Sequence, residues 1–150
     1  MNTLYELLKK DKFEKGINEI LTFVFRNNGR VDCSLRPQLV SCNETERTIT
    51  IEFPVLEWEL NSNNVMHGGI IATVFDEALG IFANYISQGK RAVTSNISVN
   101  FLKPVPQNDS LLITAKLTSS GRKLITLTGE GRLKSNNMLT DTAMATYTII

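Results

Sequence analysis

Histidine and cysteine are scarce in this 150-residue chain, which contains one histidine, His67, and two cysteines, Cys33 and Cys42. A zinc ion held by protein alone needs four ligands, or three and a water, from histidine, cysteine and carboxylate side chains. The two cysteines do not form a CxxC pair, and His67 is far from both in the sequence. We therefore expect no structural metal, no disulfide framework and no metal or redox cofactor.

An excess of either charge is also absent, because 16 Lys and Arg residues are balanced by 15 Asp and Glu residues, for a formal net charge of +1. This balance excludes a nucleic-acid-binding module whose affinity comes mainly from neutralising phosphates. It is compatible with a local basic rim around an anionic ligand.

Long hydrophobic runs are missing as well. No uninterrupted apolar run approaches the roughly 18 residues of a membrane span. The first residues carry charges from Glu6 onward and have no apolar stretch typical of an export signal. We expect no membrane partner and a cytoplasmic location. Apolar residues make up 42% of the chain and charged residues 21%, as in one packed globular domain over residues 1–150.

Apolar residues in the first part of the chain recur at three- and four-residue intervals, the period of one helix face. They are Phe13, Ile17, Ile20, Leu21 and Val24. Asp11 and Glu14 have the spacing of a capping box that would begin this helix, and Asn-Asn-Gly at 27–29 would end it. A shorter amphipathic turn precedes it at residues 4–8. We expect residues 1–30 to form an N-terminal helical extension.

The rest of the chain shows the composition of half-buried antiparallel strands. Strands are expected at residues 34–42, 48–53, 92–102, 110–119, 123–134 and 139–150. Between the second and the third, residues 70–86 are apolar almost all round, and their only charged side chains are Asp76 and Glu77. A helix that is apolar on every side is a buried one. The order of elements predicts a single α+β domain with one central buried helix.

A polar loop closed by two glycines leads into this helix. Gly68 and Gly69 open the helix, where the first N–H groups have no partner within the helix and the dipole favours negative charge. Glycine lets a ligand carbonyl approach without a Cβ in the way, which is the geometry of an oxyanion hole. Asn61 and His67 could add side-chain hydrogen bonds there. Taken alone, Asn61 would be a turn residue and His67 a structural one.

Asp76 is a carboxylate on an apolar helix, which is costly unless the group is paired or functional. No Lys or Arg lies within a helical turn on either side. Eight helical residues place Asp76 roughly 12 Å from Gly68 and about 80° round the axis, so one chain does not easily bring both to one carbonyl. Two such helices packed antiparallel about a two-fold axis would do so, and a working site then requires a dimer. Glu77 points about 100° away from Asp76, and we expect it to be structural or to face the rim.

These residues and a downstream segment resemble the hotdog-fold acyl-CoA thioesterases, and most closely their phenylacetic-acid-degradation (PaaI-like) branch. The resemblance spans about residues 48–150 and rests on Asn61, the triplet His67-Gly68-Gly69, Asp76 and the segment Thr94-Ser95-Asn96-Ile97-Ser98-Val99-Asn100-Phe101-Leu102-Lys103-Pro104. It implies a long antiparallel sheet wrapped around one central helix. It also implies homodimers that commonly pair into homotetramers.

By this resemblance the Gly68 N–H polarises the thioester carbonyl with the help of Asn61 and His67. Asp76 of the partner chain acts as nucleophile or as the base that activates water, and these two roles remain open. Thr94 lies where the family often has a serine that helps to hold the water or the aspartate. The second glycine, Gly69, belongs to a pair that suits a bound substrate better than a plain turn.

The expected partner is an acyl-CoA substrate, which would be hydrolysed to a carboxylic acid and free CoA. Two basic pairs, Lys90-Arg91 and Arg122-Lys123, and the single Lys103 are either solvated surface residues or ligands of the CoA phosphates. Two other functions remain open on the same scaffold. One is a non-catalytic acyl-CoA-binding protein, which would have no reason to bury a carboxylate, and the other is a hydratase or dehydratase.

Overall fold

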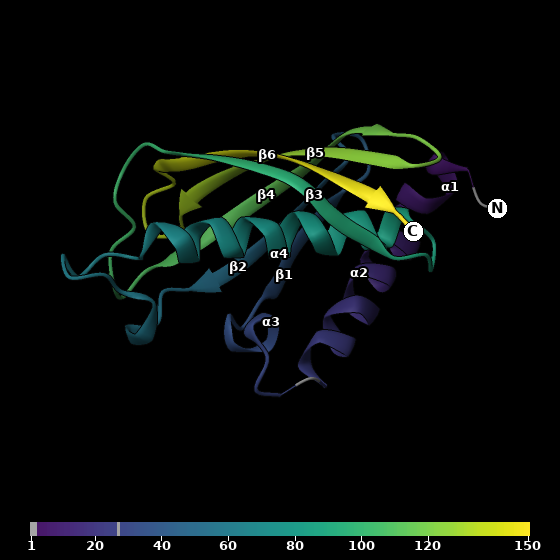
Figure 1. Cartoon of the computed structure of the whole chain (residues 1–150). Coiled ribbons are helices and arrows are strands. Elements are labelled where there is room, and N and C mark those ends of the chain that lie inside the picture. The colour runs from purple at the N-terminus through teal and green to yellow at the C-terminus, as the bar shows by residue number, and fades with distance from the viewer. Residues whose placement is uncertain (1–2, 27) are drawn as a thin grey trace.

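The computed structural model in Figure 1 describes residues 3–26 and 28–150. Three helices come first, α1 (Leu4–Leu8), α2 (Lys10–Phe25) and α3 (Val31–Ser34). They are followed by β1 (Gln38–Asn43), β2 (Thr48–Pro54), the 3-10 turn η1 (Glu57–Glu59) and the long helix α4 (Gly68–Ile86). The chain continues with β3 (Ala92–Phe101), β4 (Ser110–Ser120), β5 (Leu124–Leu133) and β6 (Leu139–Ile149).

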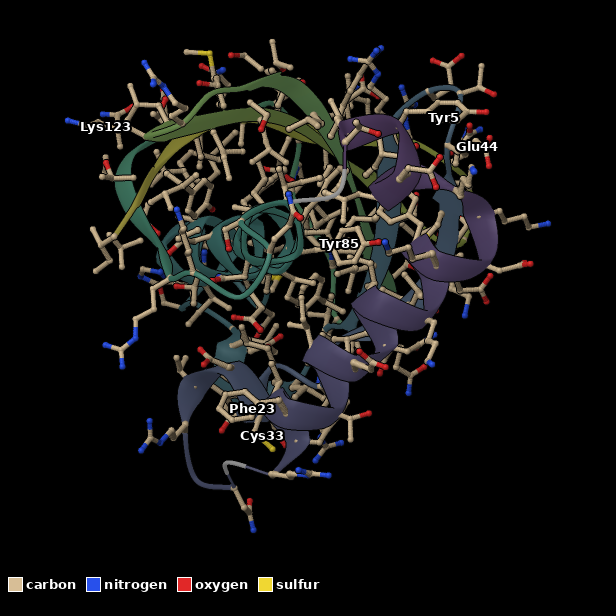
Figure 2. The ribbon with its side chains drawn as sticks, turned by 90° about the vertical axis from the view of Figure 1, so that its right-hand side faces the viewer. Tyr5, Phe23, Cys33, Glu44, Tyr85 and Lys123 are labelled. Atoms are coloured by element: carbon tan, nitrogen blue, oxygen red, sulfur yellow. The ribbon has the colours of Figure 1, made fainter. Side chains whose placement is uncertain are left out.

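The strands form one antiparallel sheet in the order β1-β2-β4-β5-β6-β3. The sheet curls around α4 (Figures 1 and 2). Two glycines of β5 let the helix lie close to the strands, because a Cβ on Gly129 would be 3.0 Å from the Phe75 ring and one on Gly131 would be 3.2 Å from it. The expected α+β architecture, a long sheet wrapped around one central helix, is confirmed.

Helix α4 supplies the centre of the core, where Val74, Phe75, Leu79 and Phe82 are fully buried. By length and composition alone, its 19 residues would suffice to cross a membrane. The expectation concerned uninterrupted apolar runs, and Asp76 and Glu77 do interrupt this one, but the helix continues through both residues. The apolar composition of α4 matches its place inside the curled sheet.

The N-terminal extension docks on the C-terminal half of α4. The Phe13 ring of α2 lies 5.3 Å from the Phe82 ring and 5.4 Å from the Tyr85 ring, measured between centroids. The Tyr85 hydroxyl donates a hydrogen bond to the Leu7 carbonyl oxygen at 2.6 Å. Figure 2 shows Tyr85 between α4 and α2. The predicted amphipathic helix and the short turn before it are confirmed.

The start of α2 differs from the expected capping box. The helix begins at Lys10, so Asp11 lies inside its first turn and caps nothing. The Lys10 N–H donates instead to Oε2 of Glu44 at 2.9 Å. Glu44 belongs to the turn between β1 and β2, and local spacing cannot reveal a cap from so far along the chain. Asn27, expected to help end α2, lies outside the described residues.

The expected strand at residues 34–42 is also corrected. Ser34 belongs to α3, where its N–H bonds the Arg30 carbonyl oxygen at 3.0 Å. Arg36 then adopts a positive φ of 53°, and β1 begins only at Gln38. The short helix α3 and its side chains lie beside α2 (Figure 2), and this placement becomes important at the site described next.

Candidate active site

Asp76 accepts two hydroxyl hydrogen bonds on one carboxylate oxygen. Its Oδ1 is 2.8 Å from Oγ1 of Thr94 and 2.9 Å from the hydroxyl of Tyr147, which also donates to the Asp76 carbonyl oxygen at 3.1 Å. Among the described residues, Asp76 forms no ion pair and its Oδ2 accepts no hydrogen bond. The carboxylate is therefore oriented by neutral donors and keeps one oxygen open to the cavity that it lines.

The sheet register brings the two hydroxyls together. Thr94 on β3 is directly opposite Tyr147 on β6. A bulge at Ser95 interrupts the regular alternation of side chains between the two faces of β3. Before the bulge, Thr94 lies on the inner face with Tyr147. Beyond it, Ile97 lies on the inner face, opposite Ala145. The sequence indicated Thr94 but not Tyr147. The available signal was the position of Tyr147 on the apolar face of β6, where a buried phenol needs a hydrogen-bond partner.

Tyr147 acts on Asp76 only as a donor. Burial, reinforced by the neighbouring Asp76 carboxylate, raises the pKa of Tyr147 far above its usual range. The phenol is therefore neutral at physiological pH, and its proton remains available to Asp76.

Glu77 lines the same cavity as Asp76 and does not simply face the rim. Burial, together with the nearby carboxylates of Asp32 and Asp76, raises the pKa of Glu77 to about 8. At pH 7 its carboxyl group is therefore mostly neutral, and two adjacent charges are avoided on this turn of α4. Asp32 comes from α3, a neighbour that the sequence did not predict.

His67 and the two glycines occupy the start of α4 as expected. His67 is the N-cap, and its Nδ1 accepts a hydrogen bond from the Gly69 N–H at 2.9 Å. This bond leaves the proton of the neutral imidazole on Nε2, and the side chain is exposed. The Gly69 N–H is occupied by His67. Within the described residues the Gly68 N–H has no hydrogen-bond partner, and it is the backbone donor left for a ligand.

Gly68 and Asp76 lie in different cavities of the single chain. Gly68 lines a small cavity of about 290 Å³ beside Phe101 and Lys103. Asp76 lines a larger cavity of about 1030 Å³ between α4, α2 and the start of β3. The separation agrees with the helical geometry, which does not bring both groups to one carbonyl within one chain.

Asn61 is engaged in its own loop. Its Oδ1 accepts hydrogen bonds from the N–H groups of Asn63, at 2.8 Å, and Val65, at 3.4 Å. Asn61 lines neither of the two cavities described above. The side-chain NH₂ is the group that Asn61 could still offer to a ligand.

The two basic pairs, although distant in the sequence, meet at the end of β6. The Ile149 N–H donates to the Lys123 carbonyl oxygen at 2.8 Å, and the Ile150 N–H donates to the Arg91 carbonyl oxygen at 2.9 Å. The loops that hold Lys90-Arg91 and Arg122-Lys123 therefore lie on opposite sides of the end of β6. Each backbone is one strand spacing, about 4.8 Å, from β6. All four side chains are exposed and, in the described part of the chain, none forms an ion pair. Figure 2 shows Lys123 extending into solvent.

An antiparallel sheet wrapped around one long central helix is the architecture of a hotdog-fold protein. Residues 63–139 match the family model described as the thioesterase superfamily, and the chain belongs to this superfamily.

Two curated relatives match part of the chain. An Archaeoglobus fulgidus protein named "Putative esterase" is 32% identical over 89 residues, which cover 59% of this chain and 56% of that protein. The Xenopus laevis acyl-coenzyme A thioesterase THEM4 is 31% identical over 85 residues, which cover 56% of this chain and 37% of that protein. The match thus spans about half or less of the length of these relatives.

Solved structures agree on the fold over most of the chain. The Escherichia coli PaaI protein from the phenylacetic acid degradation operon superposes with a TM-score of 0.77 at 20% identity, covering 91% of this chain and 94% of that one. The smu.793 protein of Streptococcus mutans, bound to acetyl CoA, superposes with a TM-score of 0.69 at 26% identity, covering 83% and 94%.

Proposed function

We propose that this protein is an acyl-CoA thioesterase that hydrolyses an acyl-CoA to a carboxylic acid and free CoA. The observation that carries the proposal is the state of Asp76, a carboxylate held by two neutral hydroxyls with one oxygen open to a cavity. A carboxylate kept for structure would be expected to have a cationic partner or a full set of donors. The acetyl CoA complex of the Streptococcus mutans protein supports the substrate class.

The chemistry follows from the open oxygen and the free N–H. Oδ2 of Asp76 either attacks the thioester carbonyl carbon or accepts a proton from the water that attacks it. The oxygen that gains negative charge is stabilised by the Gly68 N–H and the positive end of the α4 dipole. The Nε2–H of His67 and the NH₂ of Asn61 are further donors for this oxygen. The C–S bond then breaks, and CoA leaves as a thiolate that takes up a proton. If Asp76 is the nucleophile, the acyl group is left on Asp76 as a mixed anhydride, and water then hydrolyses it to release the carboxylic acid and restore the carboxylate.

The site is completed by a second copy of the chain. In the described sheet, β3 is an edge strand of ten residues with one side unpaired, and most of its side chains are exposed. Such an edge favours pairing with another strand. If two copies pair along β3 about a two-fold axis, their α4 helices run antiparallel, and Asp76 of one copy faces Gly68 of the other. We propose a homodimer with two such sites, which pairs further into a tetramer.

The hydrolase activity is tested by following free-thiol release from a panel of acyl-CoAs. Replacing Asp76 by Asn removes the base or nucleophile at nearly constant volume, and we expect the rate to fall about 10³-fold, within the range for such a group. The Kd for acyl-CoA should change only a few-fold. Asp11→Asn, an equivalent change on the exposed face of α2, is the control. Tight binding without turnover in the wild type would contradict the proposal and support a non-catalytic binding protein.

The shared site has a sharper test, because Gly68 is the first residue of α4. Proline is tolerated there, and the preceding His67 already has the extended backbone that proline requires, with φ −63° and ψ 134°. Gly68→Pro therefore removes the N–H without breaking the helix, and Gly68→Ala, which also adds a Cβ but keeps the N–H, is its control.

Chains with Gly68→Pro or Asp76→Asn should each be inactive alone. Refolded together, half of the dimers are mixed and have one intact site of two, so about a quarter of the wild-type activity should return. No recovery in verified mixed dimers would contradict the shared site.

A further inference from the structure

Two consecutive residues of α4 present carboxyl groups of different character to one cavity. Asp76 is held by the neutral hydroxyls of Thr94 and Tyr147. Glu77 is mostly protonated at pH 7, because burial and the neighbouring Asp32 raise its pKa to about 8. A carboxylate beside a carboxylic acid is the arrangement in which one group acts as a base and the other as an acid. The proton of Glu77 has no role in the hydrolysis described above.

The surroundings of Glu77 keep its proton in place. The other charged or titratable side chains that line the cavity are Glu19 of α2, Asp32 of α3, Asp76 and Tyr85 of α4, Tyr147 of β6, and Lys90 before β3. Among these described groups Lys90 alone is basic, and the groups that act on Glu77 most strongly are acidic. Asp32 contributes both its charge and a hydrogen bond, and two carboxyl groups in such contact do not both ionise readily.

We propose that Glu77 is the acid that protonates the sulfur of CoA as the C–S bond breaks. The inference rests on the thioesterase function proposed above and adds a catalytic residue to it. Asp76 and Glu77 are one residue apart on α4, with about 1.5 Å of rise between them, and both line the cavity. The acid is therefore next to the carbon under attack at Asp76, to which the sulfur is bonded.

The sulfur and Glu77 are well matched for this transfer. An alkyl thiol such as that of cysteine has a pKa of about 8.5, and burial and Asp32 bring the pKa of Glu77 to about 8. A proton passes readily between groups of similar pKa, and an acid of this strength is still mostly protonated at pH 7. Glu77 therefore combines a high fraction of the acid form with a small cost of giving up the proton.

The proton balance closes for either role of Asp76. As a base, Asp76 takes a proton from the attacking water while Glu77 gives its own proton to sulfur, and transfer of one proton from Asp76 to Glu77 then restores both groups. If Asp76 is the nucleophile, the ionised Glu77 recovers its proton from the water that hydrolyses the anhydride. In both cases one thioester and one water give one carboxylic acid and one thiol.

The test varies the leaving thiol at a constant acyl group. One thioester is made with N-acetylcysteamine, an alkyl thiol, and the other with 4-nitrothiophenol, which is acidic enough to leave without a proton. Glu77→Gln keeps the size of the side chain and an N–H donor toward Asp32 but has no proton to give. We expect kcat/KM to fall about 10²-fold for the alkyl thioester and by no more than about threefold for the aryl thioester. An equal fall for both in the folded variant would overturn the proposal.

The pH profile gives an independent readout. Glu77 loses its proton above about pH 8, so kcat/KM of the wild type for the alkyl thioester should fall there, by about tenfold for each further pH unit. Glu77→Gln should lack this fall. Glu19→Gln, the same change at an exposed carboxylate of α2 that lines the cavity, is the matched control and should keep the wild-type profile. A wild-type rate that does not fall up to about pH 10 would overturn the proposal.

A second variant serves if Glu77→Gln does not fold. Asp32→Asn removes the charge beside Glu77, so the alkaline fall should move to lower pH by about one unit; a fall that stays in place overturns the proposal. Failure of the thioesterase function is read separately, as absence of thiol release from either thioester by the wild type, and it overturns both proposals. Turnover by the wild type with an equal loss on both thioesters overturns the role of Glu77 alone.

Discussion

One added methyl group at Gly16 tests how the N-terminal extension is held on α4. A Cβ at this position would lie 2.8 Å from Cδ2 of Tyr85 and closer still to Cε2, well inside ordinary contact. The Tyr85 ring therefore has to move. It cannot move freely, because its hydroxyl bonds Leu7 and its face is stacked on Phe13.

The cost of Gly16→Ala follows from these contacts. Loss of the hydrogen bond from Tyr85 costs about 1 kcal/mol, and loss of the stacking with Phe13 costs about 0.5–1.5 kcal/mol. Residual overpacking adds about 1 kcal/mol. Alanine is favoured over glycine inside a helix by about 1 kcal/mol, which offsets part of the loss. We expect the free energy of unfolding to fall by about 1–3 kcal/mol.

Urea denaturation of four proteins measures this effect. They are the wild type, Gly16→Ala, Tyr85→Ala and the double variant. In the Tyr85→Ala background the ring is gone, so adding the methyl group at position 16 should be neutral or stabilising by up to about 1 kcal/mol. The reasoning is refuted if Gly16→Ala is as stable as the wild type, or if it loses the same free energy with and without the Tyr85 ring.

Three further predictions concern stability, the held carboxylate and the basic group. Asp141 is fully buried, and burial raises its pKa to about 6 from 3.8, so the folded protein should lose stability as the pH rises from about 4 to 6. Asp141→Asn should remove this loss and stabilise the protein by up to about 3 kcal/mol at pH 7 but not at pH 4. Equal urea midpoints of the wild type and the variant at pH 7 would contradict a destabilising charge on Asp141. Thr94→Val removes one donor to Asp76 and should lower kcat about 10-fold with KM little changed, whereas Thr94→Ser should restore the rate; no change of kcat in Thr94→Val would count against a positioning role. Arg91→Gln with Lys123→Gln should raise KM for acyl-CoA several-fold but leave KM for the same acyl group on N-acetylcysteamine unchanged, and an equal rise for both would show that the phosphates are not involved.

The helices and strands whose apolar residues recur at regular intervals could be predicted from the sequence. The residues that start the central helix could be predicted as well. Residues 70–86 are apolar all round, which places α4 in the core, and two glycines after His67 indicate a free N–H at its start. The separation of Gly68 and Asp76 into two cavities follows from helical geometry alone.

Contacts between distant segments could not be predicted. Tyr147 reaches Asp76 only because β6 pairs with β3 in one register, and no local pattern encodes that pairing. Asp32 approaches Glu77 because residues 31–34 fold as a helix where a strand was expected. In the same way, the gathering of Lys90 and Lys123 depends on both loops flanking the end of β6.

The bulge at Ser95 makes the spacing along β3 as important as the identity of its residues. One extra residue lets the strand present Thr94 to the helix and still keep Ile97 on the inner face. Deleting Ser95 would leave every other residue of the strand in place but turn the Thr94 side chain outward. We therefore expect homologues to differ often in the identity of the residue at position 95. The number of residues between α4 and the part of β3 beyond the bulge should differ far less often.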